Sequence, residues 1–403
     1  MTAPTLSEIV NNGLCLGCGG CVSAIDRPDL KMSMQADGYL RPGEVELAAS
    51  ERELLGDVCP GHALDGHAQQ PDYHRLWGPI RVVATGHATD PVVRYRGSSG
   101  GVITALSIGL VDSGEVEFVL TNAASEDDPI NNVTGPKHDR AALLASAGSR
   151  YAPSSPLADI KRYLDAGARF AFVGKPCDVA ALARWAKRDP RIDRQIPYRL
   201  AFFCAGVPSR NGTLAVLEAL GVPHEQCETF QYRGEGWPGL ARARRYDGTE
   251  ASMDYNASWG SILNRHLQFR CKICPDGVGE FADLVCADAW YGKDGYPDFT
   301  ERDGRSLIIA RTERGQALYE RALAAGWITS TPLDVAEIAK MQPYQVSRKR
   351  NVVARLSGLF AARNVRPRFR HLGLTKLALR TPLRQQLRNA LGTFKRSRCK
   401  TLS

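Results

Sequence analysis

The sequence predicts an α+β fold of mixed α/β layers, preceded by a small cysteine-bearing module and followed by a basic helical tail. Three observations predict this arrangement. Two strand–turn–helix units follow each other in the middle of the chain, three closely spaced cysteines lie near its start, and residues 348–403 contain no Asp or Glu. We place the four parts at residues 1–78, 79–165, 166–345 and 346–403.

The N-terminal module is predicted to begin with a short helix. Thr5 and Glu8 have the spacing of a capping box, in which each side chain satisfies a backbone N–H group at the helix start. This helix leads toward the stretch CLGCGGC, which holds Cys15, Cys18 and Cys21. The rest of the module is rich in Gly, Asp and His and lacks long periodic segments.

The first half of the core is predicted to alternate strands and helices. Its elements are a strand from Ile80, the turn GSSGG over 97–101, a helix that stops at Gly114, a strand FVLTNAAS and a polar loop over 125–140. β-branched residues favour the strands, and the helical spacing of apolar residues favours the helix.

The second half of the core repeats one unit. RFAFV is predicted as a strand, a turn with Cys177 follows, and Asp178 is placed as the N-cap of a helix over 179–188. YRLAFF, a loop with Cys204 and a helix form the next unit. Both cysteines therefore follow the carboxyl end of a strand, where open α/β sheets keep their ligand sites. Hairpins over 227–255, a strand SLIIART and a helix ERGQALYERALAAG complete the core.

The composition is typical of a soluble globular protein. Of 403 residues, 43% are hydrophobic and 24% are charged. No apolar run approaches the roughly 18 residues that a membrane-spanning helix needs, and the first residues do not resemble a secretory signal. We therefore expect a cytoplasmic protein, in which the odd number of 11 cysteines favours metal binding or redox chemistry over disulfides.

The first cysteine run is typical of a metal site. C-x2-C-x2-C is the spacing of the ferredoxin ligand run, whose fourth cysteine precedes a proline, and Cys59-Pro60 supplies such a pair further along the chain. Zinc is a competing interpretation, because His62 and His67 lie near Cys59 and histidine completes many zinc sites. A redox-active pair of thiols is a third, weaker one.

Spacing alone does not assign the remaining cysteines to one common site. Cys271 and Cys274 form a local C-x2-C motif, whereas Cys177 and Cys204 stand alone. Cys177, before a predicted helix, fits a reactive thiol of low pKa, and Cys204 fits a buried apolar side chain.

The glycine-rich turn GSSGG lies where a strand gives way to a helix. Free N–H groups and the positive end of the helix dipole favour a phosphate at such a turn, and Ser98 and Ser99 add hydroxyl donors. A helix cap without any ligand is an equally good interpretation of the turn alone.

Four blocks of the chain resemble, in this order, one known family. They are GSSGGVITAL (97–106), GKPCDVAAL (174–182), FFCAGVPS (202–209) and CKICPDGVGEFADLVCADAW (271–290). They are similar to the signature blocks of the coenzyme F420 hydrogenase/dehydrogenase beta subunit family. The resemblance covers roughly residues 10–330.

Members of this family are iron–sulfur flavoproteins that pass electrons between 4Fe–4S clusters, FAD and a substrate. The resemblance implies two clusters, one held by Cys15, Cys18, Cys21 and Cys59 and the other by Cys177, Cys204, Cys271 and Cys274. It also implies a ferredoxin-like iron–sulfur module before an α/β flavin-binding core, with FAD at Gly97, Ser98, Ser99, Gly100, Gly101, Arg150, Tyr151 and Lys175. The other cysteines, Cys227, Cys286 and Cys399, are expected not to be ligands.

The chain departs from the family pattern at two places. The family's usual lysine near position 150 is Arg150 here, and its usual Gly-Asp pair before an aromatic residue reads Ala287-Asp288. Neither change removes a cysteine. Both changes affect the implied pocket on the flavin side, so the sequence identifies neither the substrate nor the catalytic residues.

The tail carries most of the positive charge. Residues 348–403 contain 12 Arg and 4 Lys, so this segment carries +16 and the rest of the chain −7 of the net +9. Leucines interleave with these residues, and basic amphipathic helices suit an anionic membrane surface or the acidic face of a partner subunit. A solvated extension is a further interpretation, and nucleic acid is the least favoured partner of an acidic body.

The sequence therefore predicts a cytoplasmic oxidoreductase that depends on FAD and iron–sulfur clusters, with contact to the membrane surface through its tail. It would exchange electrons with ferredoxin, a partner subunit or coenzyme F420, and act on a small-molecule substrate. Two alternatives stay open. One is an electron-transfer subunit without catalysis of its own, and the other is a zinc-stabilised binding protein that uses its basic tail.

Overall fold

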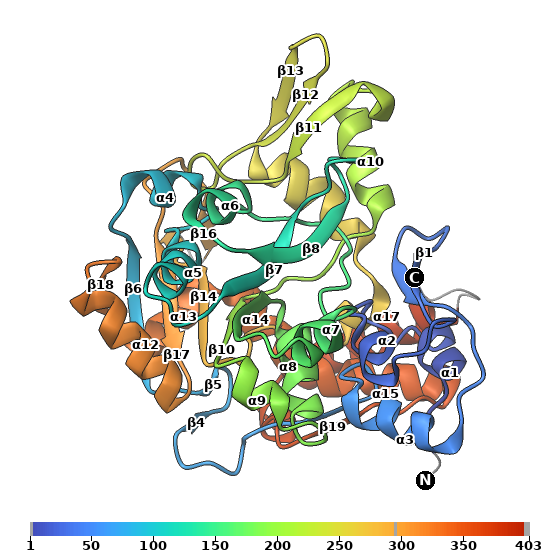
Figure 1. Ribbon diagram of the computed structural model, residues 1–403. Coiled ribbons are helices and arrows are strands. Elements are labelled where there is room, and N and C mark those ends of the chain that lie inside the picture. The colour runs from blue at the N-terminus through green and yellow to red at the C-terminus, as the bar shows by residue number, and fades with distance from the viewer. Residues whose placement is uncertain (1–2, 294–295, 399–403) are drawn as a thin grey trace.

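An eight-stranded sheet forms the centre of the molecule, and helices pack against both of its faces (Figure 1). The computed structural model describes residues 3–293 and 296–398. The strand order is β18-β6-β17-β14-β10-β9-β7-β8. In that order the strands span Ile328–Pro332, Val82–Ala88, Ser306–Ala310, Leu284–Asp288, Tyr198–Phe202, Phe170–Gly174, Phe118–Ala124 and Asn132–Lys137. The predicted mixed α/β architecture is confirmed.

The direction of the strands brings several loops to one edge of the sheet. β14, β10, β9 and β7 run parallel, and β6 points the same way because β17 is antiparallel to both β14 and β6. The carboxyl ends of β6, β7, β9, β10 and β14 therefore meet at one edge, which we call the carboxyl edge. Open α/β sheets bind ligands at this edge.

Apolar side chains of the sheet point alternately to two helical layers. Ile308 of β17 packs in one apolar cluster and Ile309 in the other. Helices α5 and α12 supply the first cluster, and α8 and α13 supply the second. Their bounds are Val102–Asp112, Glu313–Ala324, Pro176–Trp185 and Ile338–Met341. Two-sided burial explains why β9 and β10 read as near-continuous apolar runs.

The segment after β7 differs from its prediction as a polar loop over 125–140. Asn132–Lys137 form β8, an edge strand that pairs antiparallel with β7. Most of its side chains are half-buried or exposed, so the segment lacks the apolar alternation that marks a strand. The ladder with β7, rather than apolar burial, holds this strand in place.

Helix α8 also begins earlier than predicted, so Asp178 is not its N-cap. Lys175 is the N-cap, Pro176 occupies the first turn, and the Asp178 carboxylate accepts a hydrogen bond from the Lys175 N–H group at 3.0 Å. Proline is pre-organised for the first helical position, and an acidic residue three positions after the cap completes a capping arrangement. Cys177 therefore lies in the first turn of the helix rather than in a free turn.

The predicted capping box is present at the start of the N-terminal module, with Thr5 N donating to Glu8 Oε2 at 2.8 Å and Glu8 N donating to Thr5 Oγ1 at 3.1 Å.

The N-terminal module packs against C-terminal helices. Leu359 packs in the same apolar cluster as Cys15. The elements of this region are α1 (Leu6–Asn11), α2 (Gly20–Ile25), β1 (Met32–Met34), β2 (Leu40–Pro42), α3 (Ala49–Val58), β3 (Ala63–Asp65), α15 (Val352–Arg363) and β19 (Arg368–Arg370), which pairs with β3.

Shorter elements surround this frame. The remaining helices are α4 (Pro91–Arg96), α6 (Arg140–Ala145), α7 (Ile160–Asp165), α9 (Arg191–Gln195), α10 (Arg210–Ala219), α11 (Phe269–Lys272), α14 (Pro343–Arg350), α16 (Leu374–Leu379) and α17 (Leu383–Ser397). The remaining strands are β4 (Tyr73–His74), β5 (Gly78–Pro79), β11 (Cys227–Gln231), β12 (Ala241–Arg245), β13 (Glu250–Met253), β15 (Tyr291–Lys293) and β16 (Tyr296–Asp298). Four short 3-10 or π turns are η1 (His224–Gln226), η2 (Asn256–Ile262), η3 (Leu263–His266) and η4 (Val335–Glu337). Within residues 3–293 and 296–398, none of the helices has the length and apolar character needed to cross a bilayer.

Candidate functional site

The first group of cysteines lines one small pocket. Cys15, Cys18 and Cys21 come from the segment between α1 and α2 and from the start of α2, and Cys59 is the C-cap residue of α3. Together they line a pocket of about 30 Å³. Gly17, at φ +72°, turns the chain so that its N–H group donates to Cys15 Sγ at 3.4 Å. The pocket thus joins the run CLGCGGC to a cysteine of a separate helix.

Burial and mutual proximity act on these four thiols. Burial raises the pKa of Cys21 well above its ordinary value, and the charges of Cys18, Cys15 and Cys59 raise it further. Burial likewise raises the pKa of Cys18 and of Cys59. Such thiols stay protonated unless a positive group binds them, because thiolates need compensating charge when buried.

The second group of cysteines gathers at the carboxyl edge. Cys177 follows β9, Cys204 follows β10, and Cys271 and Cys274 lie in and after α11. Burial raises the pKa of Cys204 to about 12, and the nearby charges of Cys271 and Cys274 raise it as well. Cys177 in turn lies close enough to Cys204 and Cys274 for their charges to raise its pKa, which burial raises most. A reactive thiol of low pKa does not fit Cys177.

Two buried cations accompany the second group. Lys175, 7% exposed, places Nζ 2.8 Å from Asp178 Oδ2. Arg348 of α14, 3% exposed, donates from Nη1 to the Cys204 carbonyl at 2.5 Å and from Nη2 to the Cys271 carbonyl at 2.7 Å. The family resemblance implies Lys175 on the flavin, whereas here it lies close enough to the Cys177 and Cys204 sulfurs to interact with their charges.

Each cysteine group offers four thiols as possible metal ligands. Among the described residues, no three His, Cys, Asp or Glu side chains converge closely enough to hold one ion. In a 4Fe–4S cluster each of four cysteines binds a different iron atom, so its ligands stand farther apart than those of one ion. Two groups of four buried or half-buried thiols match this donor set.

The other described cysteines lie apart from both groups. Cys286 packs in the apolar cluster with α5 and α12, where burial alone raises its pKa. Cys227 packs in a separate cluster with β12, and its Sγ donates to the Thr229 carbonyl at 3.4 Å. Cys399 lies outside the described residues.

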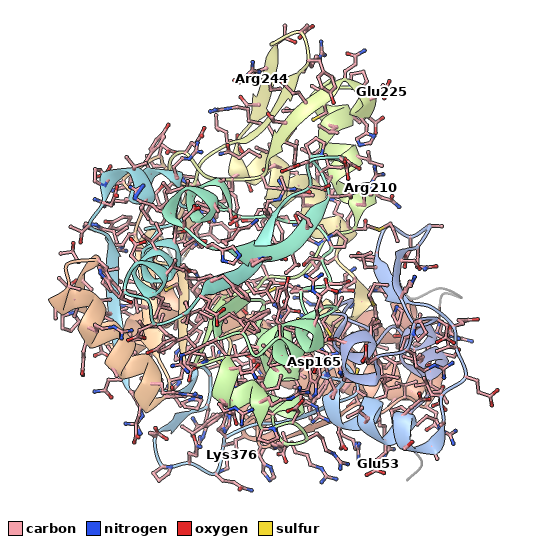
Figure 2. The ribbon with its side chains drawn as sticks, viewed as in Figure 1. Glu53, Asp165, Arg210, Glu225, Arg244 and Lys376 are labelled. Atoms are coloured by element: carbon pink, nitrogen blue, oxygen red, sulfur yellow. The ribbon has the colours of Figure 1, made fainter. Side chains whose placement is uncertain are left out.

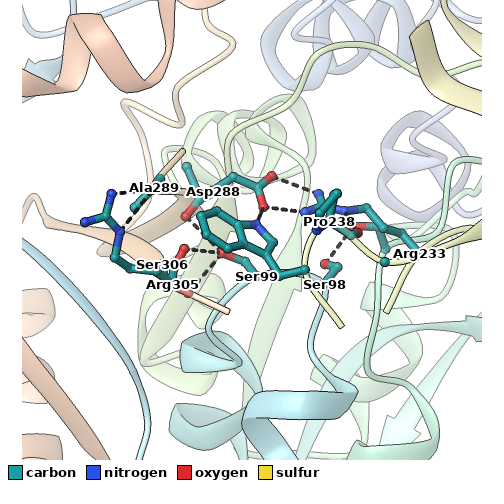
Figure 3. Close-up of polar contacts among 12 residues, drawn as sticks. Ser98, Ser99, Arg233, Pro238, Asp288, Ala289, Arg305 and Ser306 are labelled. Carbon is teal, nitrogen blue, oxygen red and sulfur yellow. Dashed lines mark hydrogen bonds and ion pairs between the residues drawn. The ribbon is translucent and has the colours of Figure 1, made fainter. Parts of the chain in front are cut away.

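The turn GSSGG lies at the same carboxyl edge, between α4 and α5. Gly97 is the C-cap of α4, and Gly101, at φ +72°, begins α5 without a side-chain cap. Ser99 Oγ donates to the Arg305 carbonyl at 2.9 Å, and Gly100 N donates to Ser306 Oγ at 2.9 Å (Figure 3). These bonds tie the turn to β17, so Ser99 has a structural role in this site.

Ser98 is the hydroxyl of the turn that reaches toward the next loop. It accepts a hydrogen bond from Ser149 Oγ at 2.7 Å. Tyr151, two residues further on, packs against Trp259 and Tyr232 with ring centroids 4.6 Å and 5.8 Å away. The turn and the loop over 148–151 therefore face each other.

The Arg150 side chain is hydrogen-bonded to four acceptors within the protein. Its guanidinium donates to Asn132 Oδ1, to the Phe230 carbonyl, and to the carbonyls of Pro129 and Asn131, at 2.8–3.0 Å. The N–H groups of the Arg150 guanidinium are thus engaged by acceptors within the protein. Arg150 thus binds the segment before β8 to β11.

We expect Arg150→Lys to lower the free energy of unfolding by about 2–4 kcal/mol, because one ammonium cannot reach four separate acceptors and leaves buried carbonyls unpaired. Chemical denaturation of the reconstituted protein measures this change, with flavin content as the second readout. Unchanged stability together with lost flavin would assign Arg150 to the ligand instead.

A buried ion pair that the sequence does not predict lies beside the turn. The Arg233 guanidinium, 2% exposed, donates two hydrogen bonds to the Asp288 carboxylate, at 2.6 Å and 2.9 Å (Figure 3). Trp237 Nε1 donates to the same carboxylate at 2.7 Å, and Trp290 stacks on Trp237 with ring centroids 4.8 Å apart. Asp288 stands out in the block ADAW, but Arg233 lies in a hairpin region without a motif.

Two models of one protein family match most of the core. Residues 83–161 match the family model "Coenzyme F420 hydrogenase/dehydrogenase, beta subunit N-term", and residues 167–336 match the model for the C terminus of the same beta subunit. The coenzyme F420-dependent sulfite reductase of Methanocaldococcus jannaschii is 24% identical over 373 residues, covering 87% of this chain and 52% of that protein. The F420-dependent formate dehydrogenase 1 subunit beta of Methanococcus maripaludis is 36% identical over 246 residues, covering 60% of this chain and 59% of that protein. The chain thus spans little more than half the length of either relative.

A solved structure shares the fold. It is a chain of the F420-reducing [NiFe] hydrogenase complex from Methanosarcina barkeri, with a TM-score of 0.54 and 19% identity. The match covers 70% of this chain and 94% of that chain.

Proposed function

The chain belongs to the coenzyme F420 hydrogenase/dehydrogenase beta subunit family, and we propose that it is an iron–sulfur flavoprotein oxidoreductase. It would pass electrons between two 4Fe–4S clusters, FAD and a substrate or a deazaflavin coenzyme of the F420 type. One observation carries the proposal. Eight buried or half-buried cysteines form two groups of four, and the second group shares the carboxyl edge with a glycine-rich helix start.

The cysteine groups would hold the clusters, which carry single electrons when bound. Cys15, Cys18, Cys21 and Cys59 would hold one, and Cys177, Cys204, Cys271 and Cys274 the other. Backbone N–H groups of the protein would then set the environment of the cysteine sulfurs that hold each cluster. The Gly17 N–H group reaches Cys15 Sγ, and the Val207 N–H group reaches Cys271 Sγ, each at 3.4 Å. Such bonds and the low exposure of both groups tune the reduction potential.

FAD would lie along the turn Gly97–Gly101 and the facing loop over 148–151. It accepts electrons in pairs or singly, so it links two-electron substrates to the clusters. The uncapped start of α5 can hold a phosphate, and Ser98 and Tyr151 would orient the cofactor. The Arg233–Asp288 pair and the stacked Trp237 and Trp290 would close the other side of this space.

A second candidate function is an electron-transfer subunit that works only within a larger complex. The curated relatives include chains named as beta subunits, and this chain covers only part of the longer relatives. A partner subunit or ferredoxin would then supply or remove the electrons. The zinc-stabilised binding protein is the remaining alternative, and it predicts neither flavin nor iron.

Anaerobic titration of the reconstituted protein tests the proposal. Reduced ferredoxin is added while absorbance follows flavin and clusters, and oxidised F420 is added afterwards. We expect both chromophores to bleach and F420 to become reduced. Bleaching without F420 reduction by the isolated chain would favour the subunit role or another substrate, and absence of any flavin signal would contradict the proposal.

A further inference from the structure

Helix α17 presents its leucines to solvent instead of to the protein core. Leu383, Leu387 and Leu391 are 71%, 55% and 59% exposed, and Leu379 at the end of α16 is 82% exposed. Leu383, Leu387 and Leu391 are four residues apart, so they lie on one side of α17, and Leu379 precedes them at the end of α16. We call these four side chains the leucine row.

The face of α17 beside the leucine row is polar and packs against α15. Thr393 and Ser397 are buried, and Asn389 Oδ1 accepts a hydrogen bond from Arg355 Nε of α15 at 3.0 Å. A Cβ atom on Gly358 of α15 would lie 2.2 Å from the Ala390 carbonyl, so the two helices are in close backbone contact. This contact fixes the rotation of α17, and the leucine row cannot turn inward.

The orientation of α17 is the reverse of the one usual for an amphipathic helix on a globular protein. Polar and small side chains normally face water, and leucines normally face the core. A contiguous exposed apolar surface marks an interaction site. The row therefore needs an apolar partner.

Charge around the row decides what that partner is. Residues 348–403 contain no Asp or Glu. The exposed basic side chains of α16, of α17 and of the residue that follows each helix are Lys376, which lies at the surface in Figure 2, and Arg380, Arg384, Arg388, Lys395, Arg396 and Arg398. A face that combines a leucine row with basic flanks matches the interface of an anionic bilayer, where apolar side chains enter the acyl boundary and cations stay at the headgroups.

We propose that the leucine row and its basic flanks dock the protein on an anionic membrane surface. The leucines supply apolar burial, and the arginines and lysines select negatively charged lipid. α15 packs against α17, and its Leu359 packs in the same apolar cluster as Cys15 of the first cysteine group. The bound membrane would thus lie on the side of that group.

Flotation of the full-length reconstituted protein with vesicles tests the proposal. Vesicles of phosphatidylglycerol and phosphatidylcholine in equal parts are compared with vesicles of phosphatidylcholine alone. We expect binding to the anionic vesicles only, weakened by high salt. Leu387→Gln with Leu391→Gln should lower the partition coefficient on the order of a hundredfold, because two leucines no longer enter the lipid.

Control variants separate docking from damage to the fold. Leu323→Gln removes a leucine of α12 that is 37% exposed, and it should bind vesicles like the unchanged protein. Arg384→Gln with Arg388→Gln should weaken binding to anionic vesicles, with thermal unfolding unchanged. Failure of the unchanged protein to float, or equal flotation of the leucine variant, overturns the proposal. So does a dimer in light scattering that the leucine variant abolishes while vesicles stay unbound.

Discussion

Cys59→Ala is expected to remove about half of the iron that the anaerobically reconstituted protein binds, from about eight to about four atoms per chain. Cys59 stands some forty residues from the run CLGCGGC in sequence, but it lines the same pocket as Cys15, Cys18 and Cys21. Its loss leaves three thiols for a cluster that needs four ligands, whereas the second group at the carboxyl edge is untouched. Iron and acid-labile sulfide analysis measures the change.

Cys286→Ala is the matched control for this result. Cys286 is also a buried cysteine, but it packs between the sheet and the α5 and α12 layer. Its replacement should leave iron at the level of the unchanged protein. Cys204→Ala should again remove about half of the iron, and the double variant of Cys59 and Cys204 nearly all of it. An unchanged iron content in Cys59→Ala would mean that another residue closes the first site.

Arg348→Gln is expected to lower the midpoint potential of the second cluster by on the order of 100 mV. The Arg348 guanidinium is buried, permanently charged, and hydrogen-bonded to the carbonyls of Cys204 and Cys271. Each added electron makes a thiolate-bound cluster more negative, so a nearby cation favours the reduced form. Glutamine keeps a hydrogen-bond donor but removes this charge.

A redox titration followed by electron paramagnetic resonance measures the shift. Arg348→Lys keeps the positive charge and should move the potential far less than Arg348→Gln, which separates the charge from the packing. The potential of the first cluster is the internal reference and should not move. Equal shifts in the glutamine and lysine variants would show that hydrogen bonding, rather than charge, is responsible.

The parts of the site that follow local rules could be predicted from the sequence. Cys177 and Cys204 each follow a short apolar strand, and parallel strands bring such positions to one edge of a sheet. The capping box of Thr5 and Glu8 is likewise a local pattern, and it is present. The apolar strands β9 and β10 were recognisable for the same reason.

Features that depend on distant contacts could not be predicted. β8 exists through its ladder with β7, and its own side chains carry no apolar alternation. The four acceptors of Arg150 come from the loop before β8, from the first residue of β8 and from β11, so neighbouring sequence does not reveal them. Arg348 reaches the second cysteine group from α14, beyond the matched family models. Tertiary packing alone assigns these roles.

The metal and flavin content of the anaerobically purified, full-length protein tests the central claim most directly. Iron, acid-labile sulfide, zinc and flavin released on denaturation are counted on one sample. Two groups of four cysteines and the turn Gly97–Gly101 predict about eight iron atoms, as much sulfide, one FAD and no stoichiometric zinc. A colourless protein with one or two zinc ions and no flavin would contradict it.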